Sequence, residues 1–427
     1  MSSTSRLLPV VLGTFAVTFT LVTGCQRERP AEPPASPGPH ASEPPGTTSA
    51  QEPPAPAPAP ATAPAPRPAS KRPAPPPLPE PLPGEREDVS AFVGGALRAV
   101  IADLDGDGAR EIVLVDASEM RVVTPRGKVV AKAPIRAGIQ ELVASDLDGD
   151  GRAEIYAGWG TTREHLATKL RLSVHRLAGG KLVEETVLEP TTTRNDVAAI
   201  VPMPDRKGVL FAYFDSKYMV TSVIARRAAQ GWDREPVATL RTATSYAHGD
   251  VDGDGTPDLV VGRVYGDAQG SDGDAFVLAP DGTRATIPTT RGLRSLAIAD
   301  GDGDGRAEVY FGDGWHQSYA AQGQGLLSWS RHGAGGFQTE VIEDTEGQYA
   351  IEDIVPASLG GQPAIIAVGN HYVRVFSHRG GRWQGLTIGG AVRDVAVGDL
   401  DGTPGDEILL VGERSEIVRL PAGAGQR

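Results

Sequence analysis

The sequence lacks the features that cross-linked or catalytic proteins often show. Cys25 is the single cysteine among 427 residues, so an intrachain disulfide is excluded. The eight histidines form neither an H-E-x-x-H segment nor a clustered zinc spacing. A G-x-S-x-G nucleophile motif and a glycine-rich phosphate loop are also missing. The sequence therefore gives no positive signal for an enzyme.

An excess of basic residues is also lacking. Lysine and arginine total 41 against 54 aspartates and glutamates, which gives a net charge of −13. A nucleic-acid partner usually requires a basic face, so this balance argues against one. Many of the acids lie in repeated short segments, which suggests that they serve a local purpose.

The chain has no hydrophobic run long enough for a typical membrane-spanning helix, which needs about 20 residues. Residues 7–22 are apolar or small and follow Arg6, as in the core of a signal peptide. The segment ends in Val22-Thr23-Gly24-Cys25, which resembles a bacterial lipoprotein box. The resemblance implies a signal peptide over residues 1–24 and lipidation of Cys25, with Gln26 favouring the outer membrane. The alternative is a simple membrane anchor with a chance cysteine.

A proline-rich segment follows. Residues 26–84 contain 22 of the 36 prolines, with an Ala-Pro run over residues 55–68. Such a composition cannot bury a core, so we predict a disordered linker over residues 25–87. The linker would hold a globular part away from a membrane, or would bind a proline-recognising domain.

One acidic turn recurs through the rest of the chain. Asp103-Leu104-Asp105-Gly106-Asp107-Gly108-Ala109-Arg110-Glu111 has carboxylates at positions 1, 3, 5 and 9. Copies run from Asp146 to Glu154, Asp250 to Asp258 and Asp300 to Glu308, and a degenerate copy runs from Asp399 to Glu407. We name these the first to fifth acidic loops.

This spacing predicts calcium sites, because calcium prefers oxygen ligands from carboxylates and carbonyls. The predicted side-chain ligands are Asp103, Asp105, Asp107, Glu111, Asp146, Asp148, Asp150, Glu154, Asp250, Asp252, Asp254, Asp258, Asp300, Asp302, Asp304, Glu308, Asp399, Asp401 and Glu407. The predicted backbone carbonyl ligands are those of Ala109, Arg152, Thr256 and Arg306. The fifth loop has Thr403 at position 5, so we expect little or no metal there. The alternative for all loops is a solvated acidic turn.

The flanks of the loops exclude the main competing motif. An EF-hand requires an acid at position 12 and a helix on each side. Here position 12 is Leu114, Ala157, Val261 or Phe311, and the flanks are short β-rich runs. Each loop should therefore join two strands.

The loop followed by an apolar strand resembles the FG-GAP/VCBS repeats. Glu154-Ile155-Tyr156-Ala157-Gly158 and Asp258-Leu259-Val260-Val261-Gly262 show the pattern. These repeats build integrin-like, calcium-binding β-propellers, so the resemblance implies an all-β fold over residues 88–427. It implies much less about function.

Repeat spacing predicts the number of blades. The loops start at residues 103, 146, 250, 300 and 399, and the two longest gaps each fit two units. The segments 197–213 and 351–369 read as strand-turn-strand units without acids. The result is a seven-bladed β-propeller of four-stranded blades. Residues about 88–93 should supply the outer strand of the last blade and close the ring.

The segments after the second strands carry polar and aromatic residues, and they should lie on the face opposite the acidic loops. Candidate ligand-binding residues there are Trp159, His165, Tyr218, Tyr265, Trp315, His316, His371 and Tyr372. Aromatic rings with polar partners suit a glycan or a peptide. The alternative is ordinary solvated loops.

The leading hypothesis from the sequence is a lipid-anchored protein of the cell envelope that binds a glycan or a protein, with structural calcium. A polysaccharide-active, lyase-like enzyme is the alternative, with His165, His316 or His371 as its base. A structural partner in an envelope complex is a third possibility.

Overall fold

The computed structural model describes residues 84–135, 138–162, 169–266, 273–289, 292–313, 325–345, 350–369 and 371–420. The chain divides into two units, residues 1–67 and 68–427, and every described residue belongs to the second. The predicted signal peptide, the lipidated Cys25 and nearly all of the predicted linker lie outside the described residues. No helix within the described ranges is long and apolar enough to cross a membrane.

The described residues form seven four-stranded antiparallel sheets, which we number as blades in chain order. Blade 1 contains β2 (Arg98–Ala102), β3 (Glu111–Val115), β4 (Glu119–Val123) and β5 (Val129–Pro134). Blade 2 contains β6 (Gly138–Ser145), β7 (Glu154–Gly160), β8 (Arg171–Ala178) and β9 (Lys181–Leu188). Blade 3 contains β10 (Val197–Met203), the 3-10 helix η1 (Pro204–Arg206), β11 (Gly208–Phe214), β12 (Met219–Arg227) and β13 (Trp232–Arg241).

The remaining blades repeat this order. Blade 4 contains β14 (Ala243–Gly249), β15 (Asp258–Arg263), β16 (Ala275–Leu278) and β17 (Arg284–Ile287). Blade 5 contains β18 (Ser295–Ala299), β19 (Glu308–Gly312), β20 (Leu326–Gly333) and β21 (Gly336–Asp344). Blade 6 contains β22 (Ile351–Leu359), β23 (Gln362–Gly369), β24 (Val373–Arg379) and β25 (Arg382–Gly389). Blade 7 contains β26 (Asp394–Gly398), β27 (Glu407–Val411), β28 (Glu416–Arg419) and β1 (Glu85–Asp88).

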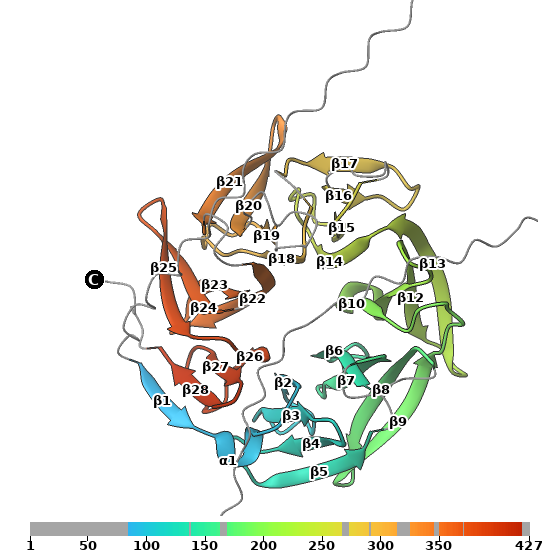
Figure 1. The fold of residues 1–427 in the computed structure, drawn as a ribbon, viewed down its shortest axis with the longest axis vertical. Helices are drawn as coiled ribbons and strands as arrows, with labels where there is room; N and C mark the ends of the chain where they lie inside the picture. Colours follow the sequence, from blue (N-terminus) through green and yellow to red (C-terminus); the bar gives the residue numbers. More distant parts are fainter. Residues whose placement is uncertain are drawn as a thin grey trace, which may run out of the picture. The chain divides into compact units, whose positions relative to one another are not determined.

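The blades form a closed ring around a central channel. The first strand of each blade contacts the first strands of both neighbouring blades, from β2 and β6 round to β26 and back to β2. These seven strands surround the centre in Figure 1, and the later strands of each blade lie progressively further out. The prediction of a seven-bladed β-propeller is confirmed, including the two blades that lack an acidic loop.

The ring closes through β1, which comes from the start of the propeller and pairs with β28 near its end. Glu85 pairs with Arg419 and Asp88 with Glu416. The prediction of an outer strand from the upstream segment is confirmed, but β1 begins three residues before and ends five residues before the predicted 88–93, so residues 85–87 belong to the propeller and not to the linker. Strand pairing stops at Asp88, and residues Ser90–Val93 form the short helix α1 instead. The Ser90 amide donates to the Asp88 carboxylate (3.0 Å), which turns the chain away from the sheet.

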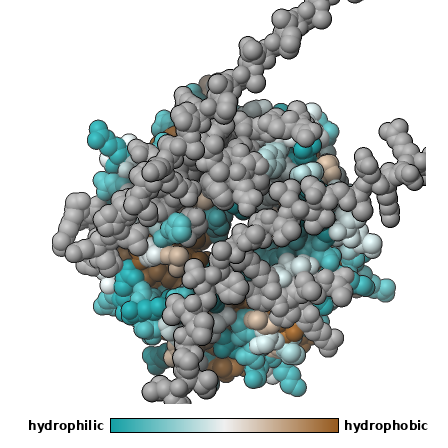
Figure 2. Space-filling model, in the orientation of Figure 1, coloured by the Kyte–Doolittle hydropathy of each residue, from teal (hydrophilic) through white to brown (hydrophobic). Residues whose placement is uncertain are grey.

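The core lies mainly between adjacent blades. The second strands β3, β7, β19 and β27 are buried along their whole length. Their near-continuous apolar sequences are typical of strands covered on both faces. On the face seen in Figure 2, hydrophilic side chains predominate around the coloured periphery, and hydrophobic ones form small separate areas. The coloured part of this face therefore shows separate apolar areas rather than one continuous patch.

Candidate metal loops and central channel

Each acidic loop joins the first strand of a blade to the second. The loops follow β2, β6, β14, β18 and β26. Because the first strands of all blades run in the same direction along the channel, the five loops lie on one face of the propeller. Blades 3 and 6, which carry no acidic loop, make the same connection through η1 and through a tight turn.

The backbone of each complete loop orients its carboxylates. In the fourth loop, Asp300 accepts hydrogen bonds from the amides of Gly303 (2.8 Å) and Gly305 (3.0 Å). Asp302 accepts from the Asp304 amide (3.1 Å), and Asp304 accepts from the Arg306 amide (2.9 Å). Gly303 and Gly305 have φ of 78° and 88°, a region that favours glycine. The first three loops repeat this pattern of acceptors and glycines.

In all five loops at least three carboxylates converge, with oxygens within 4.8 Å of one another. The converging groups are Asp103, Asp105 and Glu111; Asp146, Asp148 and Asp150; Asp250, Asp252 and Asp254; Asp300, Asp302, Asp304 and Glu308; and Asp399, Asp401 and Glu407. Each group could hold a metal ion. The fourth loop gathers four acids and is the most complete.

The acid at position 9 closes the fourth loop from the protein interior. Glu308 is 1% exposed, and its Oε2 accepts hydrogen bonds from the Tyr310 hydroxyl (2.9 Å) and the Gly301 amide (3.3 Å). Its Oε1 is buried and has no hydrogen-bond partner among the described residues. Burial, with the nearby Asp302 and Asp304, raises the pKa of Glu308 to about 7. A buried, unpartnered carboxylate oxygen beside three further acids fits a bound cation.

The other four loops differ from this arrangement, and in the first loop Asp107 is not part of the converging group. In the second loop Glu154 is 3.2 Å from the Arg176 guanidinium and is not part of the converging group. Asp258 is likewise outside the group of the third loop. In the fifth loop Arg419 lies 3.5 Å from Asp401, whose carboxylate also accepts from the Thr403 hydroxyl (2.6 Å). A side-chain cation thus lies beside the fifth loop, and Arg331 likewise lies 3.9 Å from Asp302 of the fourth.

The structure places the candidate ligand-binding residues in different environments. Trp159 and Tyr372 are only 1% and 2% exposed, so they pack in the core rather than presenting their rings to a ligand. Tyr218 is 42% exposed, with Lys217 and Arg241 within about 5 Å of its ring, and His371 is exposed. Tyr265 is partly buried. The positions His165, Trp315 and His316 lie outside the described residues.

Trp159 is buried because β7 continues to Gly160, two residues beyond the apolar run visible in the sequence. Its indole N–H donates to the Ser173 hydroxyl (2.6 Å), which contacts His175 Nε2 at 2.9 Å. His175 is 3% exposed, and burial lowers its pKa to about 4. The network is enclosed within blade 2, so we assign it a structural role.

The buried His175 predicts a loss of stability in acid. Its pKa is about 4 in the folded protein and about 6.5 when unfolded, so folding favours the neutral form. This preference contributes about 3 kcal/mol to the free energy of unfolding above pH 6.5. The contribution declines as the pH falls below 6.5 and is lost below about pH 4. Chemical denaturation between pH 7 and 4 should show a smaller decline in the free energy of unfolding for His175→Gln than for the unmodified protein. The exposed His332→Gln serves as control, and an equal decline in all three would contradict the assignment.

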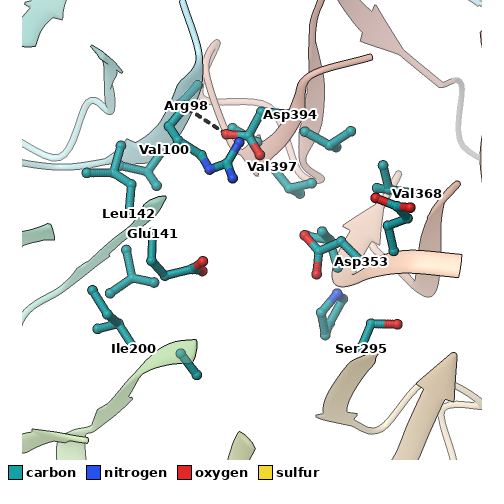
Figure 3. Close-up of a pocket in the computed structure, with 18 of the residues that line it drawn as sticks. Arg98, Val100, Glu141, Leu142, Ile200, Ser295, Asp353, Val368, Asp394 and Val397 are labelled. Atoms are coloured by element: carbon teal, nitrogen blue, oxygen red, sulfur yellow. Dashed lines mark hydrogen bonds between the residues drawn. The ribbon is translucent and has the colours of Figure 1, made fainter. Parts of the chain in front are cut away.

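The central channel contains a cavity of about 680 Å³ that residues from the first strands of all seven blades line. In Figure 3 the side chains of Arg98, Glu141, Asp353 and Asp394 surround one open space, with Glu141 and Asp353 facing each other across it. Ile200 and Ser295 lie across the same space from Arg98 and Asp394.

Strand register shows that one residue from each blade occupies the same level of this channel. In blades with an acidic loop, the acid at position 9 pairs with a residue of the first strand, as Glu111 pairs with Ala102. The residue at the channel level lies four positions before that paired residue, as Arg98 lies before Ala102. The corresponding residues, which we call the channel ring, are Arg98, Glu141, Ala199, Ser245, Ser295, Asp353 and Asp394. Sequence reasoning missed this ring, although the fixed offset from the acidic loops would have located five of its members.

The ring combines a fixed cation with acids in a confined space. Arg98 donates to the Gln140 carbonyl from Nε (3.2 Å) and Nη2 (3.1 Å), and Asp394 accepts from the Ala99 amide (2.7 Å). Burial raises the pKa of Glu141 to about 8 and that of Asp394 to about 7, although Arg98 opposes both shifts. Burial also raises the pKa of Asp353. The walls of the channel thus make these carboxylates costly to ionise without a partner.

The comparisons with known proteins do not extend this description. No protein-family model matches the chain, and the search of curated proteins finds no match. The resemblance to FG-GAP/VCBS repeats therefore rests on the loop residues and remains a prediction.

Proposed function

We propose that the protein is a calcium-stabilised β-propeller of the cell envelope that binds a ligand rather than transforming it. The observation that carries the proposal is the repetition of one acidic hairpin loop in five of seven blades, each with converging carboxylates. Such repetition is expected of a scaffold whose connections are held by metal. A single catalytic centre would not require it.

Calcium is the ion that suits these loops best. Two like charges about 4 Å apart repel by roughly 4 kcal/mol at an effective dielectric of about 20, so three or four converging acids favour a counterion. The donors are carboxylate oxygens on a flexible turn, which calcium accepts more readily than magnesium. By linking the first strand of a blade to the second, the ion would stabilise the hairpin beside the channel.

The channel could hold a small ligand. No histidine or cysteine lines its described cavity, so the histidine base of the lyase alternative is not among the residues that line it. The cavity volume of about 680 Å³ lies within the usual range for small-ligand sites, about 300–1,000 Å³. The ligand class proposed from the sequence is a glycan or a protein of the envelope.

The envelope location rests on the sequence of residues 1–25. Lipidation of Cys25 would place the propeller at a membrane, where calcium is available outside the cytoplasm. Metabolic labelling with a radioactive fatty acid in a Gram-negative host should mark the unmodified chain and leave Cys25→Ser unlabelled. Equal labelling of both forms, or of neither, would contradict the anchor.

The binding function is tested with the purified protein at 1 mM calcium. A glycan array and a crosslinking pulldown from envelope fractions should give a retained ligand, and binding should fall when calcium is chelated. A panel of acidic polysaccharides incubated with the same protein should remain uncleaved. Cleavage that His371→Ala abolishes would favour the lyase alternative instead, because His371 is exposed in the described structure.

A further inference from the structure

We propose that the channel ring binds a small organic cation, a molecule with protonated amino groups, on an arc formed by Glu141, Asp353 and Asp394. The inference rests on the proposed binding function and specifies the ligand class for the channel.

The ring is divided into two unlike arcs. The charged members Asp353, Asp394, Arg98 and Glu141 come from consecutive blades, 6, 7, 1 and 2. The members from blades 3, 4 and 5 are small, namely Ala199, Ser245 and Ser295. With three acids and one arginine, the charged arc attracts a cation, while the small arc leaves room for the rest of a ligand.

Local irregularities occur at the ring in four blades. A register shift falls immediately before Glu141, Ala199, Ser245 and Asp353, where one extra residue enters the first strand. Such bulges re-aim neighbouring side chains and are frequent beside binding sites. An uninterrupted strand would have formed the blade equally well, so the repeated bulge points to a requirement at the channel level.

The side-chain partners favour a cationic ligand over an anionic one. The Arg98 guanidinium already donates to the carbonyls of Gln140, Leu97 and Arg393, so most of its N–H groups are engaged. Glu141 extends into the channel without a hydrogen bond or ion pair to any described residue. A ligand with N–H donors would supply the partner that this carboxylate lacks.

The spacing of the acids favours an organic cation over a bare metal ion. The acidic loops bring three or more carboxylate oxygens within 4.8 Å, whereas Glu141, Asp353 and Asp394 form no such group. An amine-bearing molecule can span acids that are further apart, because each amino group donates separately. The hydroxyls of Ser245 and Ser295 line the same cavity and have no hydrogen-bond partner among the described residues.

The test uses isothermal titration of the purified protein at 1 mM calcium and pH 8. The probe is 1,4-diaminobutane, and 1,4-butanediol is the uncharged match. We expect binding of the diamine alone, with an affinity about tenfold lower or worse in each of Glu141→Gln, Asp353→Asn and Asp394→Asn. Glu340→Gln, an isosteric change of a side chain that is 67% exposed on β21, should bind like the unmodified protein.

The affinity should also depend on pH. It should rise from pH 6 to 8.5 as the ring acids ionise, because the amino groups stay protonated up to about pH 10. The charged residues that line the cavity are Arg98, Arg110, Glu141, Arg294, Glu352, Asp353, Arg393, Asp394 and Asp406. Of these, Glu141 has a pKa of about 8, so Glu141→Gln should flatten the rise above pH 7.

The outcomes separate this inference from the proposed function. Equal binding of the diol, no binding of the diamine, or binding that Glu340→Gln reduces as much as the ring variants would overturn the channel assignment. Calcium or magnesium bound with a stoichiometry that the ring variants lower would assign the ring to a metal instead. If the diamine fails while the calcium dependence of stability holds, the scaffold proposal stands without the channel ligand.

Discussion

Chelation of calcium should lower the melting temperature of this protein by about 10–20 °C. A site with a dissociation constant near 10⁻⁴ M, typical of extracellular modules, contributes about 1.4 kcal/mol at 1 mM calcium. The first four loops together contribute about 6 kcal/mol, and each kcal/mol shifts the transition of a large domain by about 2–4 °C. Scanning calorimetry in 1 mM calcium and in excess EDTA measures the shift.

Two matched substitutions distinguish calcium from a general salt effect. Asp300→Asn removes the residue that organises the fourth loop, so the shift caused by EDTA should shrink by about a quarter. Asp401→Asn in the fifth loop should leave that shift unchanged, because Arg419 already lies 3.5 Å from this carboxylate. Magnesium should replace calcium poorly, since it demands a stricter octahedral geometry. An identical melting temperature with and without EDTA would refute the metal role.

The fold could be predicted because its signal is repeated. The acidic loops fix the length of a blade, and the buried second strands read as apolar runs whether or not a loop precedes them. The degenerate blades 3 and 6 were located from β11 and β23 by that rule. Local sequence decides these features, since each blade buries the same strand between its neighbours.

The binding surface was harder to predict because it depends on the assembled ring. Trp159 reads as a loop residue, yet two further residues of β7 carry it into the core. Glu141 and Asp353 are isolated acids in the sequence, 212 positions apart, and only closure of the ring brings them to opposite sides of one cavity. The offset from the acidic loops marks the position of Glu141 but not that of Asp353, and neither residue shows its role until seven separate strands meet at one level.

Deletion of residues 85–94 should destabilise the whole propeller, lowering the melting temperature by more than about 10 °C. The deletion removes β1 and its pairing with β28, including the ion pair between Arg419 and Glu87 (3.0 Å). It also removes Val89 and Val93, which are 1% and 0% exposed and pack in the core cluster between blades 7 and 1. Each buried valine contributes about 1.5–3 kcal/mol, so the two together contribute about 3–6 kcal/mol, and the loss of pairing with β28 adds to this.

The control is a deletion of equal length, residues 68–77, in the proline-rich segment, which should leave the melting temperature unchanged. Substituting Val89→Ala and Val93→Ala together separates the core contribution from strand pairing. If pairing matters independently, the deletion will cost more than the double substitution and will promote aggregation, because β28 then exposes an unpaired edge. A deletion mutant as stable as the control would show that the ring does not depend on β1. Because β1 joins the two ends of the propeller, its loss should lower stability in the presence of EDTA as well as calcium, which separates closure of the ring from stabilisation by metal.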